Sequence, residues 1–145
     1  MRVVIQRAKN ARVEINDSIN GSIDNGLVIL VGFTYADTSH DIDYMINKIV
    51  NLRIFDDENG VMNKSILDIN GTILSISQFT LYADTKKGRR PSYANALNGE
   101  EAIKLYNLFN QKLNEIVHTE TGIFGSEMKV TLTNDGPVTI VMESR

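Results

Sequence analysis

The sequence predicts an α+β protein built from curved, largely antiparallel β-sheets, with two main helices packed on one side. Strand patterns with hairpin signals occupy both ends of the chain. Only two segments have the apolar periodicity of an amphipathic helix, which is too few for a doubly wound parallel sheet. Because 145 residues suit one hydrophobic core and no linker divides them, we expect a single domain, residues 1–145.

The N-terminal segment predicts strands. Residues 2–8 and 11–15 form two strand-like runs separated by residues 9–10, and the second run alternates apolar and polar side chains. Asn-Gly at 20–21 is a turn signal. Residues 27–31 are continuously apolar and short, which is typical of a fully buried strand.

The first helix is expected to begin at Thr38 or Ser39, either of which can cap it, with Asp41 in its first turn. The apolar residues that follow are spaced so that all lie on one face of the helix. They are Ile42, Met45, Ile46, Ile49 and Val50.

The second half of the chain predicts a strand, a helix and two closing strands. Residues 71–83 are rich in β-branched and aromatic side chains and predict one long strand. The second helix opens at Asn98, with Glu101 three positions on, as in a capping box. Its expected apolar stripe is Leu105, Phe109, Leu113 and Ile116. Strands at 128–133 and 138–142 end the chain.

Composition excludes several classes of chemistry. The absence of cysteine excludes a disulfide framework, a thiolate zinc site and a cysteine nucleophile. His40 and His118 fall at helix ends, and no spacing suggests a Ser-His-Asp triad or a metal site. We therefore expect no metal and no cofactor.

The N-terminus carries charge within its first strand-like run and lacks the pattern of a signal peptide. The longest apolar run, residues 27–33, is too short to span a bilayer. A cytoplasmic protein without a membrane partner is expected.

A net charge of −3 means that any contact with nucleic acid must use a local patch. One candidate is a loop with four basic residues in five positions: Lys86, Lys87, Arg89 and Arg90. The alternative is a solvated loop without a partner.

Residues 77–81, Ser-Gln-Phe-Thr-Leu, place polar side chains on an otherwise apolar strand. Buried polar groups need partners, so Ser77 and Thr80 either form hydrogen bonds within a sheet or line a site. Residues 134–139, Asn-Asp-Gly-Pro-Val-Thr, are also ambiguous. Asp-Gly favours an ordinary hairpin turn, whereas a cis Gly-Pro bond would point two carbonyl oxygens in nearly the same direction, toward a bound amino group.

Taken together, these segments make the whole chain resemble the D-aminoacyl-tRNA deacylases. The resemblance rests on the start of the chain at 1–8 and on the segments 77–84, 87–93, 121–125 with Met128, and 134–139. The Ser-Gln-Phe-Thr and Gly-Pro motifs are each short and weak alone. Their occurrence together, in this order and in a chain of this length, is specific for the family. Ser126 stands where the family has alanine.

The resemblance implies a homodimer with a barrel-like β core. It implies that the Gly136-Pro137 bond is cis and enters the active site of the partner subunit, where its carbonyl oxygens hold the α-amino group of the substrate. Arg7 is implied to fix that loop. The opposite wall is implied to consist of Ser77, Gln78, Phe79 and Thr80, and the pocket to be closed by Phe124 and Met128.

The implied activity is hydrolysis of the ester bond of D-aminoacyl-tRNA at its 3′ end, together with glycyl-tRNA such as glycine mischarged on tRNA-Ala. L-aminoacyl-tRNA would be rejected because its side chain would clash with the pocket wall. An activated ester needs only donors to the developing oxyanion, and the candidates are the N–H groups of Phe79 or Thr80 and the Gln78 amide.

Two alternatives stay open at this point. Thr80 or Ser77 could act as a nucleophile in an otherwise similar esterase. A nucleic-acid-binding module could instead use the basic loop at 86–90 without any turnover.

Overall fold

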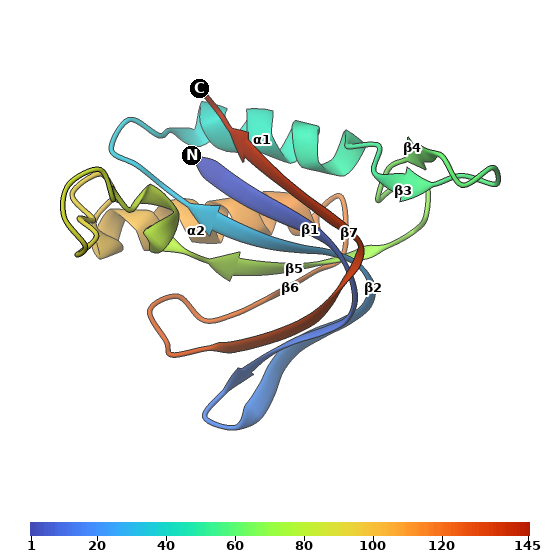
Figure 1. The fold of residues 1–145 in the computed structure, drawn as a ribbon, viewed down its shortest axis with the longest axis horizontal. Coiled ribbons are helices and arrows are strands. Elements are labelled where there is room, and N and C mark those ends of the chain that lie inside the picture. Colours follow the sequence, from blue (N-terminus) through green and yellow to red (C-terminus); the bar gives the residue numbers. More distant parts are fainter.

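The protein is described by a computed structural model that covers all residues 1–145. Two helices and a curved sheet make up most of it (Figure 1). The elements in chain order are β1 (Arg2–Ile15), β2 (Ser18–Gly32), α1 (Ser39–Asn51), β3 (Phe55–Asp56), β4 (Met62–Lys64), β5 (Thr72–Ser77), the 3₁₀ helix η1 (Phe79–Tyr82), α2 (Gly99–Asn114), β6 (Thr119–Thr121) and β7 (Lys129–Glu143).

The main sheet has five strands in the order β6-β5-β2-β1-β7. Strand β1 runs antiparallel to β2 and β7, whereas β5 runs parallel to β2 and β6. The sheet is therefore mixed: its two long pairings, β1 with β2 and β1 with β7, are antiparallel, as predicted, and the two shorter pairings of β5 are parallel. The barrel-like core is not confirmed, because β6 and β7 are edges of an open sheet and do not pair with each other.

The long strands are more continuous than the sequence predicts. Strand β1 passes through Lys9 and Asn10, where Asn10 adopts a φ of 48° and the pairing with β7 shifts register. Strand β2 passes through Asn20 and Gly21, so the predicted turn there is wrong. The hairpin turns instead at Asn16 and Asp17, whose φ values of 50° and 60° suit a tight turn between twisted strands.

The two predicted C-terminal strands form one strand, β7, with an outward bulge. Asn134 pairs with Ala8 and Thr139 pairs with Gln6, so the four residues 135–138 lie opposite Arg7 alone. Extra residues on one strand of an antiparallel pair are pushed out of the ladder. The Gly136-Pro137 segment therefore projects from the sheet.

Strand β5 ends at Ser77, six residues before the end of the predicted strand at 83. The Gln78 N–H donates to Val31 O at 2.7 Å, after which Leu81 and Ala83 donate to Gln78 O and Thr80 O. The bonds donated by Leu81 and Ala83 join residues three positions apart. They replace pairing with an adjacent strand and form the 3₁₀ helix η1. The change of conformation places η1 beside the carboxyl end of β5.

Both helices pack on one face of the sheet, as predicted. Asp41 completes a capping box with Thr38 at the start of α1, and Asn98 Oδ1 accepts from the Glu101 N–H at 3.0 Å at the start of α2. The main core joins the predicted face of α1 to residues of α2 and to one face of β1, β2 and β5.

The predicted stripe of α2 needs correction. Its buried residues are Ala102, Tyr106, Phe109 and Leu113. Leu105 is only partly buried, and Ile116 lies beyond the end of the helix and is half exposed. The face is rotated because Tyr106, with its polar hydroxyl, points inward and Leu105 points partly away.

A smaller apolar cluster lies on the other face of the sheet, where the outer halves of β1, β2 and β7 curl over it (Figure 1). Its members include Val13, Val28, Leu74 and Ile76, with Met128 packed at its border. Neither helix of the structure is long and apolar enough to cross a membrane.

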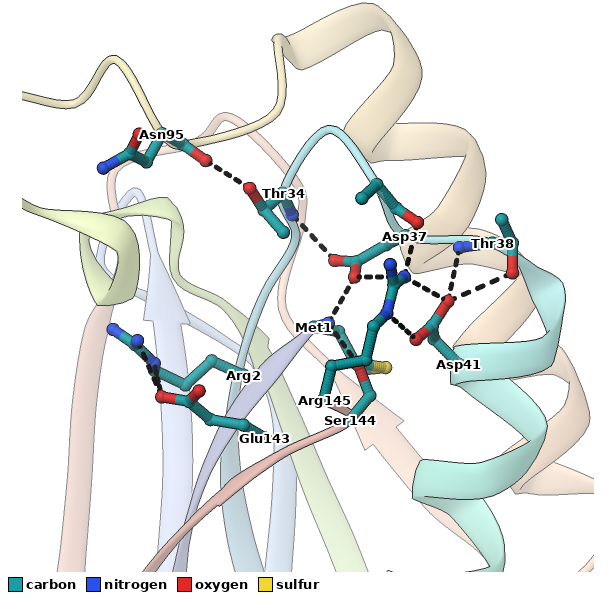
Figure 2. A network of polar contacts seen from close by, with 11 residues as sticks. Met1, Arg2, Thr34, Asp37, Thr38, Asp41, Asn95, Glu143, Ser144 and Arg145 are labelled. Atoms are coloured by element: carbon teal, nitrogen blue, oxygen red, sulfur yellow. Dashed lines mark hydrogen bonds and ion pairs between the residues drawn. The ribbon is translucent and has the colours of Figure 1, made fainter.

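A polar network ties both chain ends to the start of α1 (Figure 2). The Met1 amino group contacts the buried carboxylate of Asp37 and lies 2.7 Å from Ser144 Oγ. Arg145 donates to both carboxylate oxygens of Asp41, at 2.9 and 2.7 Å. The Arg145 hydrogen bond holds the pKa of Asp41 well below its usual range.

We expect Asp41→Asn to lower the free energy of unfolding by about 1–2 kcal/mol at neutral pH, because it removes a helix cap and a half-exposed ion pair. A carboxyl whose pKa is lowered on folding contributes stability above its unfolded pKa of about 3.9 and loses that contribution as the pH falls further. The difference between wild type and variant, measured by urea unfolding, should therefore close below that pH. Asp43→Asn, a change at an exposed position of the same helix, is the control; equal stability of the Asp41 variant and wild type at neutral pH would contradict the assignment.

Candidate active site

A pocket of about 320 Å³ lies where β5 ends and η1 begins. It is lined by residues from three parts of the chain: Ile76, Ser77, Gln78, Phe79, Phe124, Gly125, Ser126, Met128 and Val130. The residues Ile76, Met128 and Val130 belong to or border the smaller apolar cluster, so the pocket lies on the sheet face opposite the helices. The structure thus brings together five of the predicted site residues.

The first wall of the pocket is the turn from β5 into η1. Phe79 and Thr80 are the first residues of η1, where backbone N–H groups have no acceptor within the helix. The Gln78 side-chain amide donates to Thr80 Oγ1 at 2.5 Å. Thr80 does not itself line the pocket, but its hydroxyl orients the Gln78 amide that does. This wall offers several N–H donors and no ionised group.

The second wall is the loop that follows β6. The Gly122 N–H donates to Ser75 O at 3.1 Å, which anchors the loop to the strand that carries the first wall. A Cβ at Gly122 would lie 2.4 Å from the Met128 sulfur, so only glycine lets Met128 fold against the loop. Phe124 and Met128 therefore face the first wall across the pocket.

An apolar rim surrounds the mouth of the pocket. Phe79 is 55% exposed and packs edge-on against Tyr93 with ring centroids 5.1 Å apart. Ile123, next to the lining residue Phe124 in the chain, is also exposed. Exposed apolar groups beside a pocket are typical of a surface that another molecule covers.

No histidine or carboxylate is among the residues that line the pocket. His118 lies after α2 beside Glu120, at 3.6 Å, and His40 is in α1. Burial raises the pKa of the nearby Tyr82 to about 12, so its hydroxyl stays protonated at neutral pH. The lining therefore offers hydrogen-bond donors and no group that would serve as a base near neutral pH.

The Gly136-Pro137 bulge lies away from this pocket within one chain. Its peptide bond is cis, and neither residue is among the pocket lining. Figure 1 shows the bend of β7 near the β3–β4 hairpin, on the opposite side of the view from the loop that follows η1. The structure of one chain therefore does not bring together the two halves of the predicted site.

Arg7 holds the bulge from behind. Its side chain is buried and donates to Asp135 O at 3.0 Å, Ile54 O at 3.0 Å and Asp56 Oδ1 at 3.2 Å. A Cβ at Gly136 would lie 3.0 Å from the Arg7 guanidinium, so the two groups are in close contact. Arg7 therefore contacts this loop directly, and its role in fixing the loop for substrate binding stays a prediction.

The basic loop lies directly beside the pocket. Lys86, Lys87, Arg89 and Arg90 are all exposed, and the backbones of Asp84 and Ser92 pair to close the loop. The loop starts just after η1, and just beyond its closing pair Tyr93 packs on Phe79. Four cations are thus placed next to the mouth of the pocket.

Several lining residues were not predicted from the sequence, namely Ile76, Gly125, Ser126 and Val130. Ser126 stands out in the sequence only as a difference from the family. The signal that could have pointed to Gly125 is its place in a Gly-Ile-Phe-Gly segment, since it adopts a φ of 78° that favours glycine.

Comparisons with known proteins identify the family of the chain. The family model described as D-Tyr-tRNA(Tyr) deacylase matches residues 4–143. A "D-aminoacyl-tRNA deacylase" of Bacillus cytotoxicus is 54% identical over 100% of both chains, and one of Thermus aquaticus is 52% identical over 99% of this chain and 95% of its own. The chain belongs to the D-Tyr-tRNA(Tyr) deacylase family.

Solved structures share the fold. One, called "c-Myc DNA Unwinding Element Binding Protein", superposes with a TM-score of 0.95 at 38% identity, covering 100% of this chain and 99% of that one. Another, described as a probable eukaryotic D-amino acid tRNA deacylase, has a TM-score of 0.85 at 15% identity, covers 97% of both chains and supports the fold alone.

Proposed function

We propose that the protein hydrolyses the ester bond of D-aminoacyl-tRNA and releases the free D-amino acid and tRNA. The observation that carries the proposal is the pocket itself. It gathers Ser77, Gln78, Phe79, Phe124 and Met128, which the family resemblance implies for the site, in one cavity of about 320 Å³. That volume falls within the usual range for small-molecule pockets and suits one aminoacyl group.

Oxyanion stabilisation supplies the catalysis. The free N–H groups at the start of η1 and the Gln78 amide point donors at the developing negative charge on the ester carbonyl oxygen. Each such donor contributes about 2.7–4 kcal/mol in comparable sites. The ester is already activated, so water ordered by the terminal ribose hydroxyl of the tRNA completes the reaction.

The Gly136-Pro137 bulge of a second subunit completes the site. A homodimer is proposed because the bulge and the pocket lie apart in one chain, while the pocket rim is apolar and exposed. In the dimer, the Gly136 and Pro137 carbonyl oxygens accept hydrogen bonds from the α-amino group of the substrate. Arg7 keeps the bulge rigid, through a hydrogen bond of 3.0 Å to Asp135 O.

Selectivity follows from two fixed anchors. When the amino group and the ester carbon are both held, only one direction remains for the side chain, and a D-residue can use it. An L-residue would meet the pocket wall, whereas glycine has no side chain to reject. The exposed cations of the basic loop contact tRNA phosphates in this arrangement, so binding weakens as salt rises.

The proposal is tested by incubating D-tyrosyl-, L-tyrosyl- and glycyl-tRNA side by side with the purified protein. Hydrolysis of the D-tyrosyl and glycyl esters, with the L-tyrosyl ester left intact, is the expected result. Equal hydrolysis of the D- and L-tyrosyl esters, or of neither, would refute it.

Thr80 is proposed as an orienting residue and not as a nucleophile. Its hydroxyl accepts a hydrogen bond from Gln78, and no base lines the pocket to remove its proton. We expect the deacylation rate of Thr80→Ala to stay within about tenfold of the wild-type rate, because the variant loses only the hydrogen bond that orients the Gln78 amide. Abolished turnover with intact folding and tRNA binding, or an acyl-Thr80 adduct detected by mass spectrometry, would favour the nucleophile alternative.

A second candidate function is binding of single-stranded nucleic acid without turnover. It is favoured by the basic loop and by the name of one solved relative, which describes a DNA-binding protein. It predicts salt-dependent binding of unacylated oligonucleotides together with no ester hydrolysis, so the three-substrate assay separates it from the deacylase.

A further inference from the structure

Tyr106 lies behind the pocket, on the helix side of the sheet. It projects from α2 and is 2% exposed, within the main core. Its neighbours come from both walls of the pocket, although it lines neither of them. A buried polar side chain in that place needs a reason other than packing alone.

The Tyr106 hydroxyl contacts the strand that carries the first wall. It donates to Ser75 O at 2.8 Å, two residues before Ser77. The same carbonyl oxygen accepts from the Gly122 N–H at 3.1 Å, where the second wall begins. The Ser75 carbonyl oxygen of β5 therefore connects α2 and the second wall to the strand that carries the first wall.

The Tyr106 ring contacts the second wall directly. It packs against Phe124 with ring centroids 6.0 Å apart, a separation at which aromatic pairs attract each other. Phe124 in turn lines the pocket. Through one side chain, α2 is thus connected to β5 by a hydrogen bond and to the Phe124 loop by ring packing.

We propose that Tyr106 is a positioning residue that fixes the separation of the two pocket walls through its bond to Ser75 and its contact with Phe124. This inference rests on the proposed function. Discrimination between D- and L-aminoacyl groups needs a pocket of fixed width, since a displacement of about 1 Å can lower the reaction rate by about 100-fold. Tyr106 touches neither substrate nor tRNA in this role.

The hydroxyl is suited to a permanent structural bond. Burial raises the pKa of Tyr106, and contacts with Ser75, Asn110 and the Ser77 backbone oppose that rise only in part. The group therefore remains a neutral donor at neutral pH. Its bond to Ser75 O is therefore not lost by ionisation at neutral pH.

The test is Tyr106→Phe, which removes one oxygen and keeps the ring. Ser75 O retains the Gly122 N–H as a donor, so the variant leaves no carbonyl without a partner and should fold. Tyr44→Phe is the matched control, because Tyr44 is 44% exposed on α1 and does not contact the pocket. Each protein is assayed at a temperature well below its unfolding midpoint.

For Tyr106→Phe we expect kcat on D-tyrosyl-tRNA to fall about tenfold with KM unchanged, and the D-over-L rate ratio to fall by a similar factor. Amide hydrogen exchange at Gly122 should become faster, while Tyr44→Phe matches wild type in every measurement. A change in selectivity separates positioning from general destabilisation, which lowers the active fraction but leaves the ratio of rates unaltered.

Unchanged kcat and D-over-L ratio in a folded Tyr106→Phe variant would overturn the inference while leaving the proposed function intact. Should the variant prove too unstable to assay, an increase in hydrogen exchange at Gly122 no larger than the increase at the amides of α1, measured at low temperature, would overturn it equally. Failure of the wild-type protein to hydrolyse D-tyrosyl-tRNA would instead refute the function on which the inference rests.

Discussion

Replacing Arg7 by alanine is expected to lower the rate of D-aminoacyl-tRNA hydrolysis by about 100-fold, because the bulge at 135–138 loses its fixed position. Arg7 is the buried donor to Asp135 O and to Ile54 O. Without it, both carbonyl oxygens lose a partner and the Asp135 and Asp56 carboxylates lose the cation between them. The loop that is proposed to hold the substrate amine would then sample several positions.

The change should act on catalysis more than on tRNA binding. The loop that follows η1 lies on the opposite side of the view from the bend of β7, so affinity for uncharged tRNA should stay near the wild-type value (Figure 1). Lys9→Ala is the matched control, since Lys9 is a neighbouring cation 3.9 Å from Asp135 whose side chain is 54% exposed. Exposed pairs of this kind contribute little, so activity should be unchanged.

Steady-state kinetics of the two variants, with unfolding midpoints measured in parallel, check this prediction. Removing a buried charged partner also destabilises the fold by about 3–5 kcal/mol in comparable cases, so the active fraction must be measured. A folded Arg7→Ala protein with wild-type kcat would show that the bulge needs no support or plays no part in the reaction.

Dilution to the monomer is expected to abolish activity, because one chain contains the pocket and the bulge in separate places. Strand β7 is an edge strand of 15 residues, and Val141 on it is 61% exposed. A long edge strand left open is prone to pair with another chain, which fits a subunit interface on this side of the sheet. Specific activity should therefore follow the fraction of dimer.

Mass photometry and hydrolysis of D-tyrosyl-tRNA over the same range of protein concentrations measure this relation. The loss on full dissociation should exceed the loss of about 100-fold expected for the Arg7 variant, since dissociation removes the amine anchor altogether. Full turnover by a verified monomer would contradict the two-subunit site.

Local patterns predicted the helices well and the sheet less well. The face of α1 and both helix caps depend on residues within a few positions of one another, which a sequence displays directly. The uninterrupted β1 depends on β2 and β7 pairing on both sides of Asn10, and the parallel pairing of β5 depends on a distant partner. Such long-range pairing overrides local turn signals.

The site was likewise predicted only in part. The resemblance located the motifs, and the structure brings Ser77, Gln78, Phe79, Phe124 and Met128 to one pocket. The fold of η1 was not predictable, because residues 79–82 have strand-like composition and coil only after Gln78 bonds to Val31. The expected stripe of α2, which contains only aliphatic residues and Phe109, does not include Tyr106. Spacings of four and three residues along the positions 102, 106, 109 and 113 would have included it.

Subunit complementation tests the central claim most directly. Arg7→Ala damages the bulge and Gln78→Ala damages the pocket, and each homodimer should be nearly inactive. If the bulge serves the partner's pocket, a mixed dimer has one intact site, so an equal mixture after subunit exchange should regain about a quarter of wild-type activity. No recovery in a mixture shown by mass spectrometry to contain the mixed dimer would mean that each bulge serves its own chain, and would contradict the account.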